Sequence, residues 1–112
     1  MAITKAFPAT TLLSGVTSAQ TSDYVEWGEG WGGNVQADIA GTGAVTATIN
    51  VYVGLTSSFA KAILLGTISL NGTTTDKGGF SWQSTWPFVW ADLTAISGTG
   101  AAVTVNVGGA RG

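Results

Sequence analysis

The fold of this chain is decided by residues 41–53, which read Gly-Thr-Gly-Ala-Val-Thr-Ala-Thr-Ile-Asn-Val-Tyr-Val. From Val45 onward, apolar residues occupy every odd position, and residues that carry a polar group occupy every even one. A period of two is the pattern of a β-strand with one face on a core and the other toward water or a partner. The stretch therefore predicts a half-buried strand that is entered through a glycine turn.

A second copy of this pattern lies near the C-terminus, where residues 96–107 read Ile-Ser-Gly-Thr-Gly-Ala-Ala-Val-Thr-Val-Asn-Val. An alternating run also precedes each Gly-Thr-Gly, over residues 35–39 and residues 89–95. A short glycine-bearing loop between two alternating runs is typical of a β-hairpin. We therefore expect two Gly-Thr-Gly hairpins and two related halves; two copies are too few for a solenoid.

The length and composition predict one all-β domain. A chain of 112 residues supports one core, and its charged residues amount to 9 %, against about 25 % in ordinary soluble proteins. Turn signals every eight to twelve residues separate seven or eight short strands, which is typical of an antiparallel β-sandwich of jelly-roll or Greek-key type. We expect an extended N-terminal arm or first strand over residues 1–22, the sandwich over residues 23–108, and a flexible tail over residues 109–112.

The residues that are missing argue against most enzyme classes. The chain has no His and no Cys, which removes the usual general base, most metal sites, disulfides and zinc-ribbon chemistry. Its net charge is −2 and its four basic residues are scattered singly, so there is no stripe to neutralise phosphates. No apolar run approaches the roughly 18 residues of a membrane helix, and Pro8 interrupts any secretory signal. We expect no enzyme activity, no cofactor or metal, no nucleic-acid or membrane partner, and no secretion.

Two local motifs admit a ligand-binding interpretation. Residues 28–33 match G-x-G-x-x-G, but residues 34–39 predict a strand where a dinucleotide site requires a helix N-terminus. We interpret this segment as a flexible loop that exposes Trp31. Asp23, Glu26 and Glu29 form a local acidic group without EF-hand spacing. A solvated acidic rim is the interpretation, with a calcium site as the alternative.

The tryptophans between residues 80 and 96 predict a contact surface. Trp82, Trp86 and Trp90 follow one another at a spacing of four, which places side chains on one face of a strand. Trp90 then points away from the apolar face of residues 89–95. A large aromatic side chain on a non-core face, with few charges around it, indicates burial against another chain. The alternatives are a sugar-stacking platform, and core packing through a twist or bulge.

Residues 35–108 also resemble a known group of proteins. The segments that carry the likeness are Leu-Gly-Thr-Ile-Ser-Leu-Asn-Gly at 65–72, Trp-Pro-Phe-Val at 86–89 and Leu-Thr-Ala-Ile-Ser-Gly-Thr-Gly-Ala-Ala-Val-Thr-Val at 93–105. They resemble small structural proteins of tailed bacteriophages, in particular the capsid decoration (cement or stapling) proteins of short-tailed phages. Residues 54–61 lack the Asn-Asp-Gly turn expected of that pattern.

The resemblance implies a jelly-roll-like virion protein that binds the outer surface of the capsid and clamps neighbouring subunits of the major capsid protein. It implies a location on the virion, reached in the host cytoplasm during assembly, and a homo-dimer or trimer. The alternatives are a carbohydrate-binding module, with Trp31 in a flat platform, and a neck or tail component.

We expect the contacts with other subunits to come from aromatic residues and from the N-terminal arm. Replacing Trp90 by Ala is expected to weaken assembly and to leave the isolated fold intact. The residues predicted at the interface are Trp82, Trp86, Phe88, Trp90, Ile3, Phe7 and Trp31.

Overall fold

The structure, a computed structural model, describes residues 6–26, 31–84 and 86–111, of which residues 6–9, 31, 110 and 111 are described by their backbone alone. Nine strands and one short 3₁₀ helix make up this part of the chain. The strands are β1 (Ala6–Val16), β2 (Gln20–Thr21), β3 (Val25–Glu26), β4 (Trp31–Ala40), β5 (Val45–Gly54), β6 (Ile63–Gly72), β7 (Thr75–Trp82), β8 (Phe88–Ser97) and β9 (Ala102–Arg111), and the 3₁₀ helix is η1 (Phe59–Lys61).

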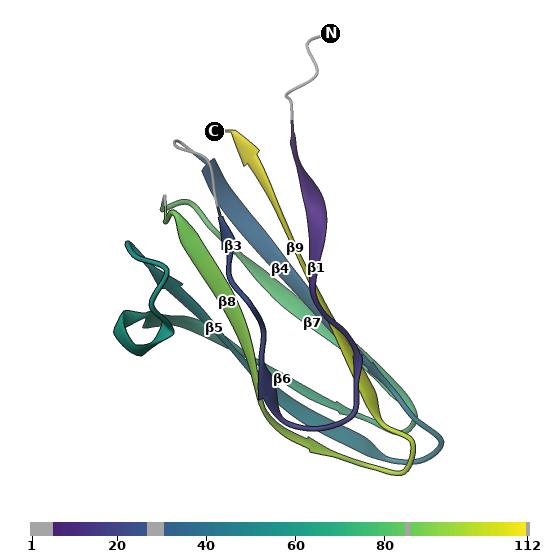
Figure 1. Cartoon of the computed structure of the whole chain (residues 1–112). Coiled ribbons are helices and arrows are strands. Elements are labelled where there is room, and N and C mark those ends of the chain that lie inside the picture. Colours follow the sequence, from purple (N-terminus) through teal and green to yellow (C-terminus); the bar gives the residue numbers. More distant parts are fainter. Residues whose placement is uncertain (1–5, 27–30, 85, 112) are drawn as a thin grey trace, which may run out of the picture.

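The strands form two antiparallel sheets that pack as a sandwich (Figure 1). Sheet A has the order β1-β9-β4-β7, and sheet B has the order β2-β8-β5-β6, with β3 pairing on β8 beside β2. If β2 and β3 count as one interrupted strand, the first strand pairs with the last, the second with the seventh, the third with the sixth and the fourth with the fifth. This is the jelly-roll arrangement of two interleaved Greek keys. It confirms the predicted fold class.

The core lies between the two sheets, where the alternating strands place their apolar side chains. Every odd residue from Val45 to Val53 is buried, and so are Val103, Val105 and Val107 of the second copy of the pattern. The same alternation buries Val35, Ala37 and Ile39 of β4. The period-two signal thus predicted correctly which side of these three strands faces the core. It fails near the end of β8, where a register shift opposite Thr48 and Ile49 leaves Ala95 exposed and packs Ile96 against the core.

The prediction of two Gly-Thr-Gly hairpins is wrong. β4 belongs to sheet A and pairs with β7 and β9, whereas β5 belongs to sheet B and pairs with β6 and β8. The turn at Gly41 therefore crosses from one sheet to the other, and the turn at Gly98 crosses back between β8 and β9. A strand that turns over into the facing sheet presents the same apolar alternation as one that turns back in its own sheet, so the sequence pattern is common to both.

The two turns also differ in backbone conformation, although their sequences agree. Gly98 and Gly100 have positive φ angles of 124° and 68°, and Gly41 and Gly43 do not. A Cβ atom on Gly98 would lie 2.6 Å from the carbonyl oxygen of Ala44. The two turns thus share a sequence and a position in the sandwich, but their backbones adopt different conformations.

Both ends of the chain contribute strands to sheet A. Residues 6–16, within the segment predicted as an arm or first strand, form β1 and pair with β9 at the edge of the sheet. Residues 109–111, within the segment predicted as a tail, lie in β9 and pair with β4. Ile3 lies outside the described residues.

Candidate docking surface

Five aromatic residues form a continuous group on the outer face of sheet B, which we call the aromatic belt. Three of them are even-numbered residues of the central strands, because the even positions of β5 and β8 point away from the core. The others come from the segment between β2 and β3 and from η1. The members of the belt are Tyr24, Tyr52, Phe59, Phe88 and Trp90.

The belt is held together by edge-to-face ring contacts. Tyr52 and Trp90 are neighbours in the β5–β8 ladder, and Phe59 reaches both, with ring centroids 5.0 Å from Tyr52 and 5.8 Å from Trp90. On the other side, the ring of Tyr24 lies 5.1 Å from Phe88 and 6.2 Å from Trp90. These are the tilted geometries that aromatic pairs favour, each contributing about 0.5–1.5 kcal/mol beyond area burial. The belt is therefore a fixed surface.

Trp90 is the centre of the belt and is buried by its own chain. Only 3 % of its surface is exposed, although its side chain lies outside the core cluster that contains Val89, Ala91 and Leu93. The six-membered ring also packs over Gly54, where a Cβ atom would stand 3.4 Å from Trp90 Cζ3. The outward direction predicted from the alternation is correct, and the ring is covered by Tyr24, Phe59 and Phe88 without a second chain.

Five large apolar side chains are left exposed by the structure, two of them members of the belt. The β5–β6 connection, drawn in teal with η1 at one end of the molecule in Figure 1, contains two of them and leads into β6, which begins with two more. This connection, residues 55–62, contains a single charged residue, Lys61. We call the group the apolar patch, and its exposed fractions are Tyr24 46 %, Leu55 72 %, Phe59 38 %, Ile63 51 % and Leu64 54 %.

The three predicted tryptophans do not share one face. Trp82 ends β7 in sheet A and belongs to the core, whereas Trp90 lies in β8 of sheet B. Trp86 lies in the connection between them, packs partly against the core, and donates its Nε1–H to Ser84 Oγ over 3.1 Å. The prediction of a common face is wrong because the chain changes sheets between Trp82 and Phe88, so the period of two is not continuous through the segment.

Of the other predicted contact residues, two lie in sheet A, one lies outside the described residues, and one lies in the aromatic belt. The backbone of Phe7 is in β1 opposite Gly109, and that of Trp31 is in β4 opposite Arg111. Their side chains, like all of Ile3, lie outside what the structure describes. Phe88 is half-buried in the belt.

Six residues of the belt and the patch were not predicted as contact residues from the sequence: Tyr24, Tyr52, Phe59, Leu55, Ile63 and Leu64. Two signals were present in the sequence. Tyr52 is the one aromatic residue on the non-core side of the run from Val45 to Val53, and residues 63–65 break the alternation with three apolar residues in succession. A break of this kind means that an apolar side chain must point outward.

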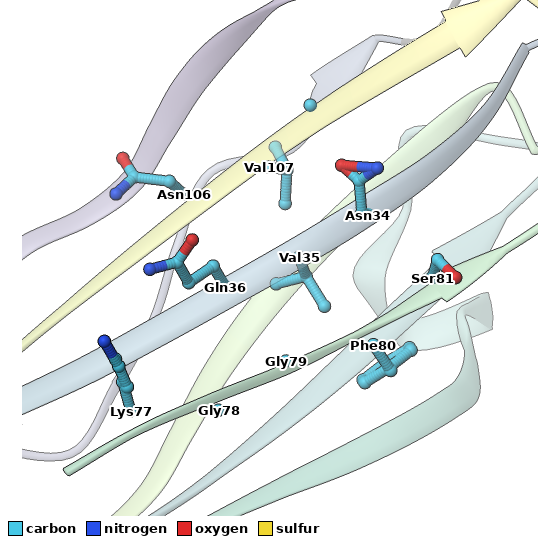
Figure 2. Close-up of a pocket in the computed structure, with 11 residues that line it drawn as sticks. Asn34, Val35, Gln36, Lys77, Gly78, Gly79, Phe80, Ser81, Asn106 and Val107 are labelled. Atoms are coloured by element: carbon cyan, nitrogen blue, oxygen red, sulfur yellow. The ribbon is translucent and has the colours of Figure 1, made fainter.

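A second feature is a shallow depression of about 620 Å³ on the outer face of sheet A. Figure 2 shows Asn34 and Gln36 of β4 beside Asn106 of β9, with Lys77 and Ser81 on β7. Asn106 Oδ1 already accepts a hydrogen bond of 2.7 Å from Thr11 Oγ1. The aromatic residue in the lining, Phe80, packs toward Gly66 of β6. The depression thus offers amides and one amine, without an aromatic ring on which a sugar could stack.

Of the predicted acidic group, Glu29 lies outside the described residues. Within residues 6–26, 31–84 and 86–111, no three residues of the metal-ligating types come together. Over the same ranges, no helix has the length and apolar character needed to cross a membrane.

No sequence-family model and no curated protein sequence matches this chain. Among solved structures, it is similar to the SPBc2 prophage-derived protein YomS, with 14 % identity, a TM-score of 0.63, and coverage of 98 % of this chain and 96 % of that one. At this identity the likeness establishes a shared fold. Two further matches are the cowpea mosaic virus top component (9 % identity, TM-score 0.43, 96 % of this chain and 85 % of that one) and infectious bursal disease virus strain Gx (5 %, 0.43, 95 % and 32 %).

Proposed function

We propose that this protein is a non-enzymatic structural component of a bacteriophage particle, which docks on the outer surface of the capsid and bridges neighbouring subunits of the major capsid protein. The observation that carries the proposal is the apolar patch, five large exposed side chains at one end of sheet B. Exposed apolar side chains that gather in one place mark sites of association with other proteins. The prophage origin of YomS agrees with the resemblance of residues 35–108 to phage decoration proteins.

The architecture of the patch suits a docking role. Phe59 and Tyr24 stand on the buried ring of Trp90, so their positions are set before any partner arrives. A surface that is already ordered loses little conformational entropy on binding, and more of its apolar burial therefore contributes to affinity. Aromatic side chains are also enriched among the residues that dominate binding energy at interfaces.

A bridging role needs no catalytic group. A protein that binds only the assembled shell stabilises that state by mass action, and many copies add their contributions. The chain has neither His nor Cys, which fits a purely mechanical task. The apolar patch and the nearly uncharged β5–β6 connection would provide the contact area.

The proposal is tested by co-sedimentation of the purified chain with capsids assembled without it. We expect saturable binding in a fixed ratio to the major capsid protein. Leu55→Asp should weaken this binding at least about tenfold, because it places a charge in the patch at a site too exposed to affect folding. The matched control is Ser57→Asp, in the same connection, which should bind like the unmodified chain.

Four outcomes would count against the proposal in different ways. Absence of binding to capsids would reject docking altogether. A copy number far below that of the major capsid protein would instead identify a neck or tail component. Equal binding by Leu55→Asp and the unmodified chain would show that the contact lies elsewhere, and saturable binding to a host polysaccharide would favour the sugar-binding alternative.

A further inference from the structure

The four edge strands of the described sheets differ in how well they are protected from pairing with another strand. β1 contains Pro8, a left-handed Gly15 and three register shifts. The edge formed by β2 and β3 consists of two-residue pieces, and β7 carries the charges of Asp76 and Lys77. Proline, irregular register, shortness and charge are the devices by which proteins prevent edge-to-edge association.

β6 has little of this protection. It runs for ten residues from Ile63 to Gly72 with no proline and no charged residue, and it has one register shift opposite Tyr52. Among the strands that the structure describes, it pairs with β5 alone. Its N-terminal end carries the exposed side chains of Ile63 and Leu64. A long, uncharged and partly apolar edge is a template for an added strand.

The hydrogen bonds of β6 indicate which of its backbone groups face outward. Asn71 donates its N–H to Asp76 Oδ2 over 2.8 Å and therefore does not direct it at β5. Because alternate residues of an antiparallel strand point the same way, the backbone groups of Ser69 and Thr67 also face outward. Asp76 thus closes the edge at Asn71, and the open part extends from Ile63 to Leu70.

We propose that two copies of this chain pair through β6, antiparallel and about a two-fold axis at Thr67, so that the two B sheets become one continuous sheet. At the axis, the outward N–H and carbonyl of Thr67 exchange hydrogen bonds with those of Thr67 in the second copy. A two-fold contact is self-complementary and closed, so it ends at a dimer. The outer face of the joint presents small hydroxyl side chains, Thr67 and Ser69, which are well suited to cross-strand pairing.

The charges at the two ends of β6 favour this antiparallel arrangement of two identical strands. Lys61 lies just before β6, and Asp76 lies beyond its other end, bound to Asn71. In the proposed register, Leu64 of one copy stands opposite Leu70 of the second copy, and the paired stretch ends where Asp76 closes the edge at Asn71. Lys61 of each copy is thereby brought toward the Asp76 of the other, whereas a parallel pairing would bring the two lysines together. The opposite charges therefore select the antiparallel orientation and the second copy as occupant.

Sedimentation velocity of the purified chain over a range of concentrations tests the pairing without any capsid. We expect a monomer–dimer equilibrium that Thr67→Lys weakens at least about tenfold, because two like charges meet at the axis. The matched control is Thr46→Lys, on the same outer face but in the central strand β5, which should leave the equilibrium unchanged. Lys61→Glu should weaken the dimer several-fold, and Lys77→Glu, on β7, should not.

A cysteine crosslink checks the position of the axis. Since the chain has no Cys, Thr67→Cys provides a single thiol, and mild oxidation should convert most of the dimer to a disulfide-linked form. Thr46→Cys should stay monomeric on denaturing gels. A chain that sediments as a monomer at every concentration, or one whose dimer responds equally to Thr67→Lys and Thr46→Lys, would overturn the inference. Either result would leave capsid docking untouched, because that is measured by co-sedimentation.

Discussion

Thr42 donates both its backbone N–H and its side-chain hydroxyl to the carbonyl oxygen of Thr99, each over 3.0 Å. The two residues are the central members of the two Gly-Thr-Gly turns, 57 positions apart in the sequence. One turn carries the chain from sheet A to sheet B and the other carries it back. The bonds therefore join the two crossings at one end of the sandwich, and they give the sequence repeat a structural role.

The first prediction concerns this junction. Thr42→Val keeps the backbone bond and removes the hydroxyl donor, so we expect the free energy of unfolding to fall by about 0.5–1.5 kcal/mol. Urea denaturation measures the change. Thr46→Val is the control, because the exposed Thr46 hydroxyl has no hydrogen-bond partner in the described part of the chain; an equal loss in both variants would mean that the bond to Thr99 adds nothing.

The second prediction concerns the left-handed glycine of the second turn. Gly98→Ala adds a Cβ atom at a φ of 124° and 2.6 Å from the Ala44 carbonyl oxygen, so it should destabilise the fold by about 1–3 kcal/mol or more. Gly43→Ala, in the first turn, adds a Cβ atom with nothing within 4 Å and should be neutral or slightly stabilising. Similar unfolding midpoints for the two variants would contradict the difference in conformation.

The third prediction distinguishes the residue of the aromatic belt that stabilises the fold from one that contacts the capsid. Because Trp90 is buried by its own chain, Trp90→Ala should lower the free energy of unfolding by about 3–5 kcal/mol and reduce the near-ultraviolet circular dichroism. Phe59→Ala removes a partly exposed ring. It should lower the free energy of unfolding by less than a fully buried side chain would, for which the value is about 1.5–3 kcal/mol. In co-sedimentation, Phe59→Ala should weaken capsid binding.

This prediction replaces the expectation from the sequence that Trp90→Ala would spare the isolated fold. If Trp90→Ala retains full stability and its near-ultraviolet signal while capsid binding is lost, the ring acts on a second chain after all. The control for Phe59→Ala is Phe80→Ala, which removes a partly buried ring on the opposite side of the sandwich and should leave capsid binding unchanged once the protein is folded.

The fourth prediction concerns the pH dependence of stability. The backbone N–H of Asn71, followed by that of Lys77, lowers the pKa of the Asp76 carboxyl below its ordinary value. A carboxyl whose pKa is lower in the folded than in the unfolded chain stabilises the fold above the unfolded pKa of about 3.9, and this contribution is lost as the pH falls through the folded pKa. Asp76→Asn should therefore be less stable than the unmodified chain at about pH 7, and the difference should shrink toward about pH 3.

Urea unfolding at several pH values measures this difference. Asp92→Asn is the comparison at a second half-buried strand carboxylate, whose Oδ1 accepts a hydrogen bond of 3.0 Å from the Thr21 hydroxyl. A gap between Asp76→Asn and the unmodified chain that stays constant from neutral to acidic pH would show that the carboxylate charge plays no part.

Much of the fold was accessible from the sequence because side-chain alternation is a local property of a strand. Val45, Ile49 and Val53 are buried as predicted, and Trp90 points to the non-core side as predicted. The composition, with many β-branched residues and few charges, favoured strands over helices throughout. The jelly-roll class followed from the number and spacing of the strands.

The candidate site was accessible only in part. The sequence directed attention to the strand that contains Trp90, and the break in alternation at residues 63–65 marked an outward apolar surface. It did not reveal that Tyr24 and Phe59 cover Trp90, because those residues are 66 and 31 positions away from it and meet it only when the two loops fold over sheet B. Nor did the sequence indicate that Trp82 and Trp90 lie in different sheets.

The alternation in the sequence therefore identifies the core-facing side of a regular strand, since residues i and i+2 share a face wherever no bulge intervenes. The partner of each strand, by contrast, depends on the tertiary structure. Backbone N–H and carbonyl groups are the same in every residue, so the ladder that joins β4 to β9 instead of β5 leaves no trace in the local pattern. The partners in turn decide which edges stay open and which aromatic rings meet, and with them the surfaces available for other chains.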